Sequence, residues 1–366
     1  MLKERSASRL GAVFAVFAVI SMACSSGATT APASQAAASQ AAASQAAASQ
    51  AAASQAAASP TFKTTNIAFM AGQLGIPFYT SVECGARTAA AQFNVNLNWA
   101  GPTDWDINKQ MPFIQAAQQL NPDGWIFSPT DGKALISMIQ DYMSKNIPVV
   151  TIDAPLDQPV ELQSIQSNHY AGGQAAAKAM IGLTGGKGKY VVVGNTPGLP
   201  DIDARVKGFV DDMTKAGATV LPVLEPGTDS TKAANEVAAA IQGTPDLAGV
   251  YVTHSAAAQG ASAAILEAKM QGKIKLVAFD ADPQQIRDLK AGVYDALIAQ
   301  LPYQMGYESV KLVADVLNGV VDPKTVKHDN PTDFAILTRT NADDPANSKF
   351  LYIGDMSQCA KMAAGQ

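Results

Sequence analysis

Charged residues are scarce in this sequence, and so are the residue types that most often build metal and catalytic sites. Charged residues fill 16% of the 366 positions, the formal net charge is −5, and there are three histidines and three cysteines. Net negative charge argues against nucleic-acid binding, because phosphates demand a basic surface. The histidines lack metal-ligand spacing, and the GxSxG, HExxH and CxxC signatures are absent. We expect no metal, no cofactor and no enzyme, although acids in a cleft could still do general acid–base work.

Long hydrophobic runs are also missing, with one exception near the start. Residues 10–20 form an apolar run that is too short to span a bilayer and follows three basic residues, so we expect a secretory signal peptide over residues 1–24. The run ends in small residues before Cys24, which resembles a bacterial lipobox and implies a lipid anchor on Cys24. Ser21 departs from the leucine that is commonest there, so ordinary cleavage stays an alternative. We expect an extracytoplasmic protein, in the periplasm or on the outer face of the membrane.

The next segment, residues 25–61, is small and polar. The sequence SQAAA repeats five times over residues 34–58, with no net charge and no apolar stripe by which a helix could dock. We interpret this segment as a tether, which suits a lipid anchor that must hold a domain away from the membrane.

From residue 66 onward, apolar runs alternate with helical patterns. Strands are predicted over residues 67–70, 95–99, 125–127, 147–152, 190–193, 220–224, 250–253, 276–279 and 296–299. Among the segments between them, helices are predicted over residues 78–93, 108–120 and 131–145. This alternation is typical of an α/β protein, and so many strands exceed one small sheet. We predict two Rossmann-like, doubly wound lobes with parallel sheets and a ligand cleft between them.

Residues 275–302 contain the clearest βαβ unit. A strand closes on Asp280, a short helix follows the DADP turn, and a second strand ends at Gln300. Open α/β sheets bind ligands at the carboxyl ends of their strands, so Asp280 and Gln300 are candidates for hydrogen bonding to a ligand. The alternative is that Asp280 only caps the turn that follows it.

Seven phrases occur in a family-specific order: IPFYTSVECGA, PDGWIFSPTD, IPVVTID, SNHYAGG, ARVKGF, LVAFDADP and ALIAQLPYQMG. With them, the chain from about residue 64 to 340 resembles the periplasmic sugar-binding proteins of the ribose and galactose type, which are receptors of bacterial ABC importers. The resemblance implies two lobes joined by three hinge strands, with crossings near Ser167, Gln300 and residues 325–335. The first lobe would comprise residues 62–167 and 301–330, the second 168–300 and 331–342, followed by an extension over 343–366.

The resemblance also implies a set of ligand-binding residues. Asp153 and Arg205 fall where the family places an acid and a sugar-clamping guanidinium, and Asp280 and Gln300 match its second acid and its hinge amide. His254 lies where the ribose type carries asparagine, so it could keep a hydrogen-bonding role. The alternative is that His254 is only a residue at the rim of the cleft. For Arg205 the alternative is a solvated helix charge.

Aromatic residues complete the predicted site, since a sugar offers apolar ring faces as well as hydroxyl groups. Phe78 and Tyr79 open the first helix beyond a strand end, where rings could stack on a sugar, although Phe78 also suits the core. Trp105 lies at the expected edge of the cleft. It either stacks on the sugar there or has no stacking role, and the sequence leaves both alternatives open.

The first lobe departs from the ribose type next to its acid. Asp153 is followed by Ala154 and Pro155 instead of an arginine, so one guanidinium is missing. His254 or Trp105 could fill that gap. We therefore expect a neutral ring with an apolar face, such as a deoxyhexose, a pentose or a cyclic polyol, and we expect phosphorylated sugars to fit worst.

Cys84 and Cys359 are predicted to form a disulfide bond. On the helix that begins at Phe78, Cys84 lies opposite the apolar face, and an outward thiol on an exported protein is a liability unless it is paired. With Cys24 assigned to lipid, Cys359 is the remaining partner. Two free thiols are the alternative.

We predict a monomeric substrate-binding protein that closes over a monosaccharide or small polyol and delivers it to the permease subunits of an ABC importer. The alternative is a sensory protein that presents a sugar or a furanose quorum signal to a membrane receptor, because the phrase GPTDWD resembles a phrase of the autoinducer- and rhamnose-binding branch.

Overall fold

A computed structural model describes residues 62–364. The predicted signal peptide (1–24), Cys24 and the tether (25–61) lie outside the described residues. Within the described part of the chain, no helix is long and apolar enough to cross a membrane.

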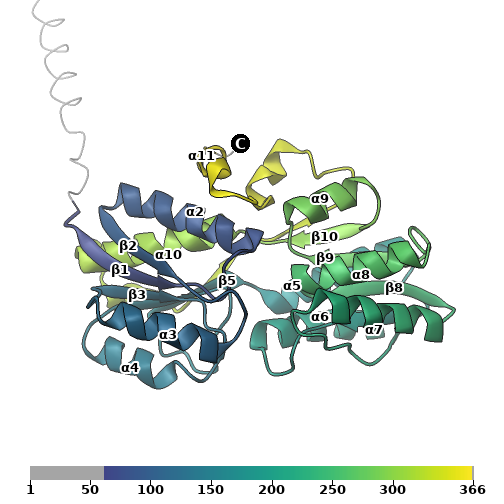
Figure 1. The fold of residues 1–366 in the computed structure, drawn as a ribbon, viewed down its shortest axis with the longest axis horizontal. Helices are drawn as coiled ribbons and strands as arrows, with labels where there is room; N and C mark the ends of the chain where they lie inside the picture. Colours follow the sequence, from purple (N-terminus) through teal and green to yellow (C-terminus); the bar gives the residue numbers. More distant parts are fainter. Residues whose placement is uncertain (1–61, 365–366) are drawn as a thin grey trace, which may run out of the picture. The chain divides into compact units, whose positions relative to one another are not determined.

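The first lobe is built on a six-stranded parallel sheet in the order β11-β5-β4-β3-β1-β2. Helices α2 (Pro77–Gln92) and α10 (Pro302–Leu317) cover one face, and α3 (Ile107–Gln118) and α4 (Ile136–Ser144) cover the other (Figure 1). Both faces are therefore buried, which explains the continuous apolar runs of the central strands. The strands are β1 (Thr65–Met70), β2 (Val95–Ala100), β3 (Gly124–Phe127), β4 (Val149–Ile152), β5 (Gln163–Ser167) and β11 (Asp329–Thr332).

The second lobe repeats this plan with the order β12-β10-β9-β8-β6-β7, in which only β12 runs antiparallel to its neighbour. Helices α5 (His169–Thr184) and α6 (Pro200–Lys215) pack on one face, and α7 (Ser230–Gly243), α8 (Ser255–Glu267) and α9 (Pro283–Lys290) on the other. The strands are β6 (Lys189–Val193), β7 (Thr219–Val220), β8 (Leu247–Val252), β9 (Lys275–Phe279), β10 (Ala296–Ala299) and β12 (Ala335–Leu337).

The chain passes between the lobes three times, after β5, after β10 and after β11. The third passage lies further along the chain than residue 330, where we expected the first lobe to end. Because β11 stays paired with β5 as far as Thr332 and Ser167, the passage falls at residues 333 and 334.

Two predicted elements are shorter than expected by three residues or more. The strand over residues 220–224 stops at Val220, because Pro222 has no N–H to donate, and only an isolated bridge from Leu224 to Val193 continues the pairing. The helix over residues 131–145 begins at Ile136. Its expected first turn is instead held by the Asp131 carboxylate, which accepts the backbone N–H groups of the second and third residues after it.

Two glycines allow α5 and α6 to pack closely. A Cβ at Gly173 would lie 2.1 Å from the carbonyl oxygen of Arg205, and a Cβ at Gly208 would lie 2.1 Å from that of Tyr170. Any larger residue would push the helices apart. The close contact fixes α6, which carries Arg205, against α5, which carries His169.

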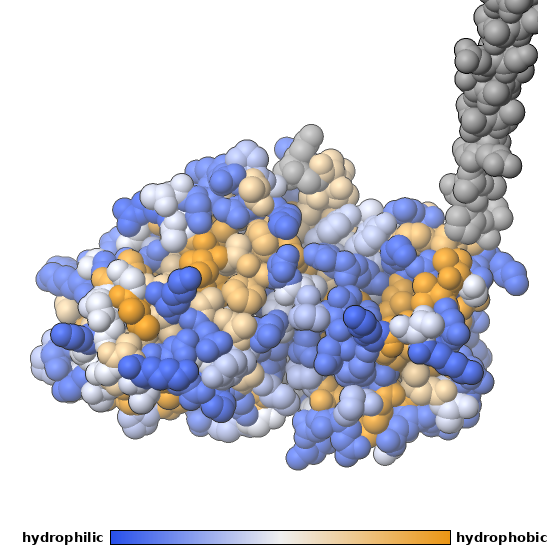
Figure 2. All heavy atoms as spheres, turned by 180° about the vertical axis from the view of Figure 1, so that it is seen from behind, coloured by the Kyte–Doolittle hydropathy of each residue, from blue (hydrophilic) through white to orange (hydrophobic). Residues whose placement is uncertain are grey.

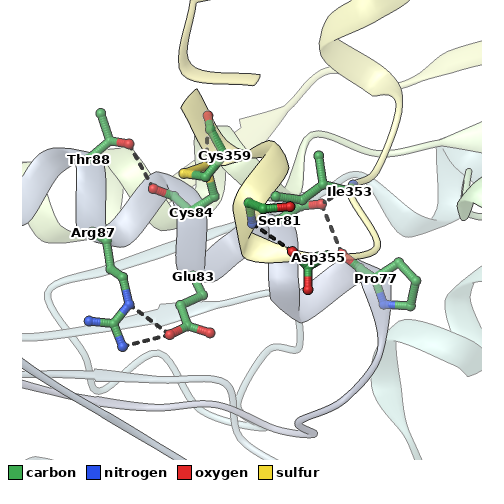
Figure 3. The surroundings of a disulfide bond; sticks show 10 residues. Pro77, Ser81, Glu83, Cys84, Arg87, Thr88, Ile353, Asp355 and Cys359 are labelled. Atoms are coloured by element: carbon green, nitrogen blue, oxygen red, sulfur yellow. Dashed lines mark hydrogen bonds and ion pairs between the residues drawn. A yellow bond between two sulfur atoms is a disulfide. The ribbon is translucent and has the colours of Figure 1, made fainter. Parts of the chain in front are cut away.

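A disulfide bond joins Cys84 on α2 to Cys359, with a Cα–Cα distance of 5.4 Å, which is the predicted pairing (Figure 3). Cys84 is fully buried, so it does not face solvent as the helical pattern alone suggests. The reason is the C-terminal segment, which passes over α2 and ends in α11 (Cys359–Ala363).

Figure 2 shows hydrophilic residues over much of one face of the molecule, with hydrophobic residues in separate areas between them. Five large hydrophobic side chains are exposed among the described residues: Phe113, Leu120, Leu183, Leu266 and Val320. They come from helices and loops of both lobes. Single exposed apolar side chains of this kind are normal for a water-soluble surface.

Candidate functional site

A cleft between the two lobes encloses a cavity of about 310 Å³. The first lobe contributes residues after β1, β2 and β4, and the second contributes residues after β6, β8 and β9, so strand ends from both sheets meet at the cavity. The structure brings together at this cavity all eight residues that the sequence predicted as ligand-binding: Phe78, Tyr79, Trp105, Asp153, Arg205, His254, Asp280 and Gln300.

Arg205 is buried, with 3% exposure, and is not a solvated helix charge. Its Nη1 donates to the carbonyl oxygen of Thr253 at 2.7 Å, and its guanidinium carbon lies 4.2 Å from the centre of the Phe279 ring. Its Nε donates to Nδ1 of His169 at 3.2 Å. These contacts fix the plane of the guanidinium before any ligand arrives.

His169 links Arg205 to the opposite lobe. Because its Nδ1 accepts from Arg205, its Nε2 carries the proton and donates to the carbonyl oxygen of Asp153 at 2.9 Å. Burial, followed by the charge of Arg205, lowers the pKa of His169 well below its ordinary value, so the ring is neutral. His169 was not predicted as a site residue, since the sequence shows it only as part of the phrase SNHYAGG.

Asp280 and Gln300 form the base of the site. Gln300 Nε2 donates to Asp280 Oδ1 at 2.9 Å, and the backbone N–H of Ser255 donates to Asp280 Oδ2 at 2.9 Å. Gln300 Oε1 faces Arg205 Nη2 at 3.5 Å. Asp280 therefore does not merely cap its own turn. Its backbone has a φ of +77°, a conformation that aspartate and asparagine tolerate better than most residues.

Tyr79 and Asp153 form the wall contributed by the first lobe. The Tyr79 hydroxyl donates to Asp153 Oδ2 at 2.7 Å and also bonds to the Ser128 hydroxyl. Burial, and next the charge of Asp201 in the other lobe, raise the pKa of Asp153 to about 7. The Asp201 carboxylate of the second lobe thus opposes the ionisation of Asp153 in the first lobe across the cleft.

Trp105 and Phe78 provide flat apolar surface. The Trp105 ring is tilted by 37° from the ring of Tyr79. A Cβ atom at Gly72 would lie 2.3 Å from the Trp105 ring, so the ring can occupy this position only because residue 72 is glycine. Its indole Nε1 is buried without a hydrogen-bond partner among the described residues. Phe78 packs edge-on against Tyr79 and Tyr352, and so it belongs to both the core and the cavity lining.

His254 reaches the cavity, but both ring nitrogens are already bonded. Nδ1 accepts from the backbone N–H of Ala257 at 3.4 Å, and Nε2 donates to the carbonyl oxygen of Gly194 at 3.1 Å. Burial lowers the pKa of His254 to about 4, which keeps the ring neutral. It therefore has no spare hydrogen bond with which to replace the missing guanidinium.

Two further acids line the cavity, Asp201 and Asp282. Each is more than nine-tenths buried, and each has an Oδ1 atom without a partner among the described residues. Asp201 lies one helical turn before Arg205, with 4.0 Å between its Oδ2 and Nη2 of Arg205. That i, i+4 spacing is the sequence signal that could have identified it.

The cavity is rich in hydrogen-bond acceptors. Four carboxyl groups line it, from Asp153, Asp201, Asp280 and Asp282, and Arg205 is the one permanent cation among the described lining residues. Such a cavity suits a ligand with several O–H donors and repels one that carries phosphate. Within residues 62–364, no three His, Cys, Asp or Glu side chains are placed so that they could together hold a metal ion.

Two lobes of parallel sheet with a polar cleft at their strand ends define the class of two-lobed solute-binding proteins. Residues 67–320 match the model of the family described as periplasmic binding protein domain, and the chain belongs to that family. The family consists of extracytoplasmic binding proteins and not of enzymes.

Relatives and solved structures agree with this assignment. The chain is 24% identical over 264 residues to the D-allose-binding periplasmic protein of Escherichia coli, covering 69% of this chain and 85% of that one. It is 25% identical over 273 residues to the ribose import binding protein of E. coli, covering 75% and 90%. An ABC transporter solute-binding protein from Agrobacterium vitis, solved with α-D-tagatopyranose, has a TM-score of 0.74 and 31% identity, covering 79% of this chain and 99% of that one.

Proposed function

We propose that this protein closes its two lobes over a neutral monosaccharide. It is the monosaccharide-binding component of an ABC importer, and it delivers the sugar to the permease subunits in the membrane. The observation that carries this proposal is the hydrogen-bonded row Arg205, Gln300 and Asp280 along one side of the cavity. This row places the Arg205 guanidinium, a hydrogen-bond donor, near the Asp280 carboxylate, an acceptor. Two neighbouring hydroxyl groups of a sugar can bond to such a pair.

In the proposed complex, Arg205 donates to sugar oxygens while Asp280 and Asp153 accept from sugar hydroxyls. The free Oδ1 atoms of Asp201 and Asp282 accept further hydroxyls. These atoms would otherwise remain buried and unpaired, at a cost of roughly 1–3 kcal/mol each.

The aromatic residues hold the ring face. Trp105 and Tyr79 stack on the apolar side of the sugar, with Phe78 packed behind Tyr79. The Trp105 N–H, which lacks a partner among the described residues, donates to one ring substituent. His254 contributes its shape and not a hydrogen bond.

The named ligands of similar proteins support a neutral sugar. Besides the allose-binding and ribose import binding proteins and the tagatopyranose complex, a second solute-binding protein from A. vitis, 25% identical, was solved with D-fucose. All four are monosaccharides without phosphate. Trp105 and the four acids that line the cavity decide which of these sugars it selects.

A thermal-shift panel tests the proposal. Neutral pentoses, hexoses, deoxyhexoses and inositols are compared with sugar phosphates at equal concentration. A ligand that binds only the folded protein adds RT ln(1 + [L]/Kd) to the free energy of unfolding, so the tightest binder raises the melting temperature most. We expect the largest rise with a neutral sugar other than ribose. If only a phosphorylated sugar stabilises the protein, or if ribose does so best, the proposed reading of the cavity is wrong.

We further propose that Cys24 is lipidated and that residues 25–61 tether the two lobes to the membrane surface. The small residues before Cys24 and the uncharged SQAAA repeats support this. Metabolic labelling with a fatty acid should mark the wild-type chain and not Cys24→Ser. Equal labelling of both chains would remove Cys24 as the anchor.

A further inference from the structure

The C-terminal extension crosses from one lobe to the other. It leaves the second lobe after β12, where the Asp343 carboxylate pairs with Lys290 at the end of α9. It reaches the first lobe at Ile353, whose backbone N–H donates to the Ser81 hydroxyl on α2 at 3.0 Å. Figure 1 shows this segment lying over α2 and α9, and it is then fixed to α2 by the Cys84–Cys359 disulfide.

Midway along this crossing, Tyr352 reaches the back of the ligand site. Its side chain is 4% exposed and does not line the cavity. Its hydroxyl donates to Asp280 Oδ1 at 3.2 Å and accepts from the backbone N–H of Gln300 at 3.1 Å. Its own backbone N–H donates to the carbonyl oxygen of Ala281 at 3.2 Å. The extension thus contacts both residues at the base of the site.

The Asp280 carboxylate has little freedom left once Tyr352 is in place. Oδ1 accepts from Tyr352 and from Gln300 Nε2, while Oδ2 accepts from the backbone of Ser255. The Tyr352 hydroxyl also fixes the backbone of Gln300, at the point where the chain passes between the lobes. A carboxylate and an amide held in this way lose less side-chain entropy when a ligand binds.

We propose that Tyr352 is a positioning residue for sugar binding, and that the Cys84–Cys359 disulfide acts on affinity by holding Tyr352 behind Asp280 and Gln300. This inference rests on the proposed function, because it assumes that Asp280 and Gln300 bind the sugar. Through Tyr352, the C-terminal extension contributes to sugar recognition. Burial raises the pKa of Tyr352 well above its ordinary value, so its hydroxyl keeps its proton for donation at physiological pH.

The Phe78 ring completes the connection to the first lobe. It packs edge-on against Tyr352, with 5.7 Å between ring centres, and edge-on against Tyr79, with 5.2 Å. Tyr352 therefore contacts the aromatic wall of one lobe and the polar base of the other at once. A change in its place would disturb both sides of the sugar site.

Calorimetric titration of the sugar that binds wild-type protein tests this inference with four variants. Tyr352→Phe removes only the hydroxyl, and we expect about a tenfold loss of affinity, because Asp280 and Gln300 would then lose their freedom only when the sugar binds. The control is Phe350→Leu, which alters a buried residue of the same extension that has no hydrogen bond to the site. We expect it to lower the melting temperature of the unliganded protein while it leaves the affinity within about twofold.

The double variant Cys84→Ser with Cys359→Ser separates positioning from general stabilisation. We expect about a threefold to tenfold loss of affinity on its own, and little further loss when it is combined with Tyr352→Phe, because both changes act through the same hydroxyl. The inference would be overturned if the loss of sugar affinity followed the fall in melting temperature in every variant. It would also be overturned if the affinity losses of Tyr352→Phe and of the double cysteine variant added fully. Wild-type affinity in Tyr352→Phe would overturn it as well. A wild-type protein that binds no sugar would instead overturn the proposed function, and this inference with it.

Discussion

Replacing Arg205 with alanine should weaken sugar binding more than any other single change in the cavity. The guanidinium is buried, has no carboxylate oxygen closer than 4.0 Å within residues 62–364, and is the one permanent cation among the described lining residues. Its loss would leave sugar oxygens without a donor and would strand the nearby carboxyl groups of Asp201 and Asp280. Truncating one partner of a buried charged hydrogen bond costs about 2–4 kcal/mol, which is at least a tenfold loss of affinity.

Arg205 also supports the fold, so affinity and stability must be measured separately. It bonds to His169 and Thr253 and stacks on Phe279, and its removal should lower the urea midpoint of the unliganded protein. Arg205→Lys is the matched variant, because it keeps the charge and loses the planar fork. We expect calorimetry to show weaker binding for both variants, with a larger loss for alanine. Wild-type affinity in a folded Arg205→Ala protein would refute the assignment of Arg205 to the sugar.

Three further predictions concern other parts of the molecule. Asp153→Asn should stabilise the unliganded protein at pH 8 but not near pH 4, by up to roughly 4 kcal/mol. The pKa of Asp153 is about 7 in the folded protein against an ordinary value of 3.8, so the wild-type protein loses stability as the pH rises from about 4 to 7. Equal urea midpoints for the two proteins at pH 8 would contradict this. Trp105→Ala should weaken sugar binding about tenfold and Trp105→Phe less, through lost stacking; equal calorimetric affinities would remove Trp105 from the site. Cys84→Ser with Cys359→Ser should lower the free energy of unfolding by about 2–5 kcal/mol, since the bond closes a loop over 275 residues of sequence separation; urea curves that coincide with the wild type would contradict this.

The fold could be predicted where burial controls the sequence pattern. The central strands are apolar because helices cover both faces of each sheet, and the predicted strand over residues 296–299 matches β10 residue for residue. The strands β5 and β11 were not predicted from pattern, because QSIQS and DNPT alternate or lack apolar residues. They lie on the outer side of the first sheet, where the chain passes between the lobes and less of each strand is buried.

The site could be predicted where a strand end positions a polar residue. Asp153, Asp280 and Gln300 each follow a strand directly, so their meeting at one edge follows from parallel sheets. His254 also follows a strand, and its Nδ1 caps the helix that comes next, but the contact that occupies its Nε2 is with Gly194 in the loop after β6, which no local pattern reveals.

Contacts between distant segments could not be predicted in the same way. Tyr352 approaches Asp280 from 72 residues further along the chain, from within an extension that the family resemblance does not cover. Cys84 is buried by that same extension, although its place on the helix alone indicates exposure. Asp201 was not among the predicted site residues, because its burial depends on its place at the cavity between the lobes.

The most direct test of the account is a calorimetric titration of the purified two-lobed part of the chain with the neutral sugar that stabilises it most in the thermal-shift panel. We predict one sugar bound per chain, with binding lost in Arg205→Ala and undisturbed by an equal concentration of that sugar's phosphate. Heat of binding from the phosphate alone, or binding of the neutral sugar that survives Arg205→Ala unchanged, would contradict a cleft organised around Arg205, Gln300 and Asp280.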